Sequence, residues 1–152
     1  MSHAIPGAGF GAEPGRTPVA HTHDPAYQAY QILHVGFTLA LLLSGIDKFF
    51  HFLVNWDAYL SPAYASIVGG HTHTLMLVVG AIEIIAGIGV ALAPRFFSYV
   101  VAAWLVGIIV NLCLIPASNP MPHYDVALRD FGLFLGALAL GRLSQAYSAH
   151  RH

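Results

Sequence analysis

The chain has 152 residues, of which 57% are hydrophobic and only 9% are charged. A soluble domain usually carries about 25% charged residues, so this composition indicates a membrane protein and excludes an ordinary soluble domain. The formal net charge of −1 gives no reason to expect nucleic acid as a partner. At this length we expect a single domain.

Residues 1–26 are expected to form a flexible N-terminal tail, because they are rich in Gly, Pro, Ala and His. They lack the basic start and apolar core of a cleavable signal, so the first membrane helix has to direct insertion. We expect that helix from about Tyr27 to Phe52. Asp24 is its predicted N-cap, and Pro25 suits its first turn.

The connection from Leu53 to His73 is long and not strongly polar. Trp56, Tyr59 and Tyr64 belong to the aromatic types that gather at a membrane surface. We therefore expect an interfacial aromatic loop between the first and second spans.

The second span, Leu75–Ala93, is apolar and contains one ionisable residue, Glu83. A hydrocarbon core about 30 Å thick needs roughly 20 helical residues, which this segment supplies. Thr72 or Thr74 is expected as its N-cap. A carboxylate inside a membrane usually faces the protein interior and has a partner there.

Two more apolar helices are expected, at about Phe96–Ile115 and Tyr124–Ala146. Prolines at 94, 116, 120 and 122 mark the short connections. Four long hydrophobic segments with short loops predict an all-α, up-down-up-down bundle of four transmembrane helices over residues 27–146. Residues 147–152 form the C-terminal tail.

The basic residues predict the orientation. Lysine and arginine accumulate in cytoplasmic loops of membrane proteins. Four of the six lie on the side of the two termini, namely Arg16, Arg95, Arg142 and Arg151, whereas Lys48 and Arg129 lie nearer the other side. We therefore expect a multi-pass protein of a bacterial-type cytoplasmic membrane with both termini in the cytoplasm.

Polar side chains from all four predicted helices converge on the outward half of the bundle, and Glu83 lies deeper beneath them. They are Asp47, Lys48, His51, His71, His73, Asn111, His123, Arg129 and Asp130. Asp47 and His51 are four residues apart and share a helix face. The acidic groups either pin the helices by neutralising Lys48 and Arg129, or they form a pocket with protonatable groups.

Glycines share helix faces with these polar residues, which predicts that the faces point into the bundle and let other helices approach. Three such faces are Gly80, Glu83 and Gly87; Trp104, Gly107 and Asn111; and Arg129, Gly132 and Gly136.

The outward histidines suggest a cofactor. A neutral imidazole is a natural axial ligand of haem iron, and His51 and His71, on different helices, are the candidates for holding haem b. His73 and His123 are further candidates for cofactor contact. The sequence has no Cys-x-x-Cys-His motif, so any haem would be bound non-covalently.

Short motifs in this chain resemble the DoxX and DoxX-like family of small four-helix membrane proteins. They are Gly45-Ile-Asp-Lys48 with the downstream Trp56 and Leu60, then Gly80-Ala-Ile-Glu83-Ile-Ile-Ala-Gly87, and Arg129-Asp130 heading a helix that ends Gly136-Ala-Leu-Ala-Leu-Gly141. The resemblance covers about Tyr30 to Leu143. It implies a membrane subunit associated with oxidoreductases, linked in some relatives to quinone-dependent oxidation of sulfur compounds.

The leading hypothesis is an anchor and electron-transfer subunit that passes electrons to membrane quinone, with haem b as a second candidate cofactor. His51, Asp47, Glu83 and Asp130 are candidates for hydrogen bonds and proton transfer to quinone, with Trp104 and Asn111 beside them. Lys48 or Arg129 is the candidate for stabilising the negative charge of a semiquinone anion. Catalytic subunits on the outward face would oxidise the primary substrate.

Two alternatives remain open. In the first, the chain is a non-catalytic assembly subunit whose buried charges only hold the helices together. In the second, it is a small carrier that uses Glu83, although the sequence shows no inverted repeat or broken helix. A homo-oligomer is compatible with each of these functions.

Overall fold

The computed structural model describes residues 23–116 and 123–147, and every regular element in these ranges is helical. The four long helices are α1 (Pro25–Phe50), α3 (Thr72–Leu92), α4 (Pro94–Cys113) and α5 (Tyr124–Tyr147). The 3-10 helix η2 (Trp56–Tyr59) and the short helix α2 (Pro62–Ile67) lie between α1 and α3. The all-α prediction is confirmed, while the predicted tails fall largely outside the described residues.

Three helices, α1, α3 and α4, are long and apolar enough to cross a membrane. Their outer surfaces carry large hydrophobic side chains, and Leu43, Ile85 and Phe96 are each more than half exposed. In a bilayer, lipid covers such side chains, so these helices indicate an integral membrane protein. α5 is not one of these three helices, and it carries four charged residues, Asp125, Arg129, Asp130 and Arg142.

The predicted start is confirmed for α1 but not for α3. Asp24 caps α1, because its carboxylate accepts a hydrogen bond from the Ala26 N–H at 3.0 Å and Pro25 occupies the first helical position. α4 begins at Pro94, two residues before the expected start at Phe96, so Pro94 is the first residue of the helix and not part of a loop. The prediction of a threonine cap for α3 is wrong: His71 occupies the N-cap position, and its side chain makes no capping hydrogen bond.

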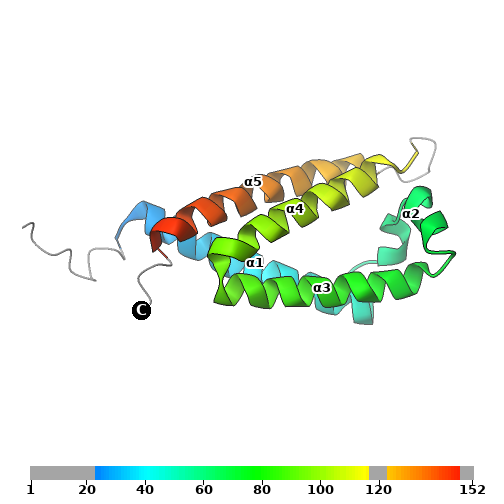
Figure 1. The fold of residues 1–152 in the computed structure, drawn as a ribbon, viewed down its shortest axis with the longest axis horizontal. Helices are drawn as coiled ribbons and strands as arrows, with labels where there is room; N and C mark the ends of the chain where they lie inside the picture. The colour runs from blue at the N-terminus through cyan, green and yellow to red at the C-terminus, as the bar shows by residue number, and fades with distance from the viewer. Residues whose placement is uncertain (1–22, 117–122, 148–152) are drawn as a thin grey trace, which may run out of the picture.

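The long helices pack mainly as two pairs, α1 with α3 and α4 with α5. Figure 1 shows the pairs close together at the α3–α4 turn and farther apart toward the end where η2 and α2 lie. A buried hydrophobic core joins the pairs near that turn and includes Tyr30, Val90, Val101 and Leu140. The opposite end, here called the η2 end, contains charged side chains and a cavity in place of a continuous hydrophobic core.

Glycines bring α1 and α3 into direct backbone contact. A Cβ atom on Gly45 would lie 2.8 Å from the Gly80 carbonyl oxygen, and one on Gly80 would lie 2.9 Å from the Gly45 carbonyl oxygen. Gly87 lies against Leu42 in the same interface. The predicted close approach along the face of Gly80 and Gly87 is therefore confirmed.

The same inference is wrong for Gly107 on α4 and Gly132 on α5. Nothing lies within 4 Å of a Cβ atom added at either position, and both residues are exposed. At these two positions, a glycine on the same helix face as a polar residue does not mark a contact with another helix. A single glycine can also lie on the outer surface of a helix.

The connection between α1 and α3 is fastened to α4. The Asn111 side chain donates to the Tyr59 carbonyl at 2.8 Å and accepts from the Ser61 N–H at 3.0 Å. Ser61 is fully buried and caps α2. One amide side chain therefore satisfies two backbone groups of an otherwise irregular segment.

The glycine contact makes a testable prediction. Gly45→Ala is expected to lower the free energy of unfolding by about 1–3 kcal/mol, because the new methyl group meets a backbone carbonyl that cannot rotate away. Gly36→Ala on the same helix is the matched control, since nothing lies within 4 Å of its added Cβ. Thermal unfolding of the detergent-solubilised protein, followed by circular dichroism, measures both. Equal Tm shifts in the two variants would contradict the helix contact described here.

Candidate functional site

A buried ion pair joins α1 to α3 at the η2 end. The Lys48 Nζ atom lies 2.7 Å from Glu83 Oε2, and the side chains are only 4% and 7% exposed. Ser44, one turn before Lys48, donates a hydrogen bond to the same oxygen at 3.2 Å. Both charges are thus satisfied within the protein, as burial in an apolar layer requires.

Trp56 of η2 covers this pair. The Lys48 ammonium lies 3.7 Å from the centroid of the Trp56 ring, which is a cation–π contact. The indole N–H donates to Asp47 Oδ2 at 2.7 Å. Two neighbouring residues of α1 therefore hold one indole, Lys48 at its face and Asp47 at its edge.

Asp47 serves the turn that follows α1. Its Oδ1 atom accepts hydrogen bonds from the backbone N–H groups of Phe52 and Leu53, each at 2.9 Å. His51 ends the helix in the left-handed conformation, with φ 55°, and its N–H bonds to the Asp47 carbonyl. Asp47 and His51 thus lie in the last turn and at the C-cap of α1. There the Asp47 carboxylate accepts hydrogen bonds from the backbone N–H groups of the turn and from the Trp56 indole.

A cavity of about 400 Å³ lies between the two helix pairs, next to the ion pair. Side chains from all four long helices and η2 line it, and most of them are apolar, including Phe37, Met76 and Leu105. Of the residues predicted to form a site, it contains Lys48, Glu83, Trp104, Arg129 and Asp130. These five residues therefore converge on one cavity as predicted, although Arg129 reaches it from an exposed position and not from the bundle interior.

Two polar groups in the wall have no partner among the described residues. The Trp104 Nε1 atom is buried and makes no hydrogen bond. Asp130 is partly buried, lines the cavity, and pairs with neither Lys48 nor Arg129. A buried donor without a partner costs free energy, so such a group in a cavity wall indicates a place where a ligand or water binds.

Arg129 differs from the buried charges. Its guanidinium pairs with Asp125 at 3.0 Å, one turn away on α5, and both side chains are about 70% exposed. The pair lies at the mouth of the cavity rather than inside the bundle, and an exposed pair of this kind contributes little to stability. Arg129 can therefore leave Asp125 at little cost and contact a ligand that enters.

Histidines and Asn111 lie around the cavity without lining it. His123 is buried and stacks on Tyr59, with ring centroids 4.3 Å apart. The Asn111 side chain donates a hydrogen bond to the backbone carbonyl of Tyr59 in the same segment. Both predicted cofactor contacts thus act on η2, whose Tyr59 lines the cavity.

The structure does not bring His51 and His71 together. The His51 ring stacks on His73, with centroids 5.4 Å apart, whereas the exposed His71 bonds through Nδ1 to the Val68 carbonyl. Asp57 joins His51 and His73. Neither His51 nor His71 lines the cavity, so an axial pair for haem b stays a prediction.

Sequence reasoning missed several residues that complete the site. Ser44 precedes Lys48 by four residues, and this helical spacing was a usable signal. Trp56 and Tyr59 were expected only as aromatic residues of an interfacial loop. They lie in a segment without periodicity, so their place at the cavity depends on how the connection folds back over the bundle.

The buried pair makes a prediction about stability. Lys48→Met leaves Glu83 buried without compensation, so it is expected to lower the free energy of unfolding by about 3–5 kcal/mol. Glu83→Gln is expected to act similarly, and the double variant is expected to regain part of the loss. Arg129→Met is the control, because its exposed ion pair predicts little change. Additive losses in the double variant, measured by unfolding in detergent, would show that the two charges do not stabilise each other.

The chain matches no protein-family model, and neither the curated proteins nor the solved structures include one that is significantly similar to it.

Proposed function

We propose that this chain is the membrane subunit of an oxidoreductase complex and that its cavity binds the head group of a membrane quinone. The observation that carries the proposal is the cavity itself. It has about 400 Å³ of space between apolar helices, its walls are mostly apolar, and two polar groups in them, Trp104 Nε1 and Asp130, have no partner among the described residues. Small-molecule sites in proteins have this size and this composition.

The residues in the wall suit the parts of a quinone head group, which is a flat ring with two carbonyl oxygens. Trp56, Tyr59 and Trp104 offer aromatic surfaces for stacking. The free Trp104 N–H is a hydrogen-bond donor for a carbonyl oxygen. The unpaired Asp130 carboxyl group can hold or release the proton that quinone chemistry requires.

The Lys48–Glu83 pair supplies electrostatics rather than a free acid or base. Lys48 is already bound to Glu83 and stacked on Trp56, so its charge stays in place and favours a developing negative charge in the cavity. Electrons would arrive from partner subunits at the outward face, because the chain carries no catalytic domain of its own within the described residues.

The membrane arrangement that accompanies this proposal has four spans in up-down-up-down order. α5 has 24 residues and packs along the length of α4, which favours a span despite its polar first half. Both termini would be cytoplasmic, because Arg95 and Arg142 lie at the end opposite to η2. The resemblance to the DoxX family supports the same arrangement.

A second candidate function is a non-catalytic assembly subunit. The observation in its favour is that Glu83, Lys48 and Asp47 each have hydrogen-bond partners within the chain, as residues that only hold helices together would have. In this alternative the cavity would contain lipid, and quinone would not compete for it.

Tryptophan fluorescence distinguishes the two functions, because both tryptophans of the chain, Trp56 and Trp104, line the cavity. Titration of the detergent-purified protein with a short-chain quinone is expected to quench the emission saturably. Ala40→Phe places a ring in the cavity and is expected to weaken binding at least about tenfold, a change of about 1.4 kcal/mol.

Ala29→Phe is the matched control for this titration. It adds the same ring to an exposed position three turns earlier on α1, away from the cavity, and is expected to leave quenching unchanged. Linear, unsaturated quenching that is identical in all three proteins would reflect partition into detergent. That outcome would contradict the quinone site and favour the assembly subunit.

The haem prediction has its own measurement. If His51 and His71 hold haem b, the protein purified from native membranes has a Soret band, and His51→Ala and His71→Ala abolish it. A featureless visible spectrum from an intact complex would eliminate haem without affecting the quinone proposal.

A further inference from the structure

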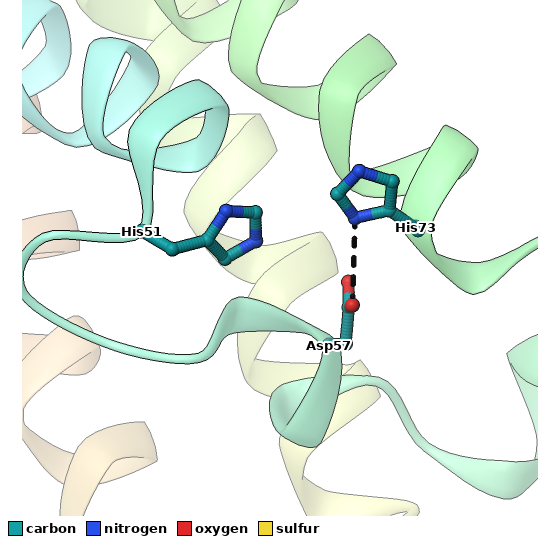
Figure 2. A group of neighbouring side chains, drawn as sticks. All are labelled: His51, Asp57 and His73. Atoms are coloured by element: carbon teal, nitrogen blue, oxygen red, sulfur yellow. Dashed lines mark ion pairs between the residues drawn. The ribbon is translucent and has the colours of Figure 1, made fainter.

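We propose that His51, Asp57 and His73 bind one divalent transition-metal ion, with Zn²⁺ as the best match, at the η2 end of the molecule. The three side chains come from the end of α1, from η2 and from the first turn of α3. Figure 2 shows the two imidazole rings and the carboxylate facing one another. The proposal is independent of the quinone site, because none of the three residues lines the cavity.

The distances fit a metal site. Each residue offers one ligand atom, and these atoms lie within 4.8 Å of one another. His73 Nδ1 lies 3.5 Å from Asp57 Oδ2, which is long for a hydrogen bond. It is close to the separation of about 3.3 Å between two ligands of a tetrahedral Zn²⁺ with bonds near 2.0 Å.

The hydrogen bonding of Asp57 leaves one carboxylate oxygen available for a metal ion. Its second carboxylate oxygen, Oδ1, is buried and has no hydrogen-bond partner among the described residues. An ionised oxygen without a partner costs free energy. A metal ion bound to this carboxylate satisfies that oxygen, either directly or through a metal-bound water.

The donor set determines the class of metal. Two imidazole nitrogens and one carboxylate oxygen suit first-row transition metals such as Zn²⁺, whereas Mg²⁺ and Ca²⁺ prefer all-oxygen sites. The His73 side chain is 59% exposed, so solvent reaches the cluster. Three protein ligands plus water give the four-coordinate geometry that zinc favours.

Metal binding would fix the position of η2. One ion would connect α1, η2 and α3 at three points, in addition to the contacts that Asn111, Trp56 and His123 already make with or within this connection. Because a metal site forms only in the folded chain, its binding free energy adds to the stability of this segment.

Zinc content tests the proposal. The full-length protein without an affinity tag is equilibrated with Zn²⁺, separated from free ion by gel filtration and analysed for bound zinc. His51→Gln, Asp57→Asn and His73→Gln are each expected to lose one tightly bound equivalent per chain. His71→Gln removes an exposed histidine two residues from His73 and outside the cluster, so it is expected to retain that equivalent.

The wild-type protein provides a second measurement that needs no variant. Its Tm is expected to rise on addition of Zn²⁺ and to fall back with a chelator, whereas Mg²⁺ and Ca²⁺ have no effect. The proposal is overturned if Zn²⁺ leaves the wild-type Tm unchanged. It is overturned equally if the three site variants bind as much zinc as His71→Gln does.

Discussion

The ion pair between Lys48 and Glu83 is the interaction on which the arrangement of the first two long helices depends. Two charges remain in an apolar layer only when they contact each other and nearby dipoles, so α1 and α3 must be close and in a single register. Gly45 and Gly80 permit that approach, since their backbones touch where side chains would collide. The glycine contact thus lets α1 and α3 come close enough for the ion pair, and the ion pair keeps the two helices in the register of that contact.

Lys48 and the neighbouring Asp47 determine the course of the connection that follows. Lys48 holds the face of the Trp56 ring and Asp47 holds its N–H edge, so the 3-10 helix that carries Trp56 has to lie over the end of α1. Asn111 fastens the next residues to α4. As a result η2 forms a wall of the cavity between the helix pairs, although nothing in its own sequence is periodic.

The η2 end therefore combines two kinds of chemistry in one small region. Inside the bundle, aromatic rings, a fixed positive charge and an unpaired carboxyl group surround a space suited to a flat, polar-edged ring. Outside it, two imidazoles and a carboxylate face one another at distances suited to a metal ion. Both arrangements depend on the position of η2, so a ligand at one of them would stabilise the segment that serves the other.

The sequence alone determined what local rules control: the helical class, the apolar spans, the Asp24 cap, and the interior position of Glu83 beside Gly80, because hydropathy, capping and helical periodicity act over a few residues. It also predicted that polar residues from all four long helices gather at one end of the molecule. Only the tertiary structure decided which partners they have. Glu83 contacts Lys48 rather than Arg129, and His51 joins His73 and Asp57 rather than His71, because these choices depend on helix rotation and on the fold of an aperiodic connection, which no residue specifies within its own neighbourhood.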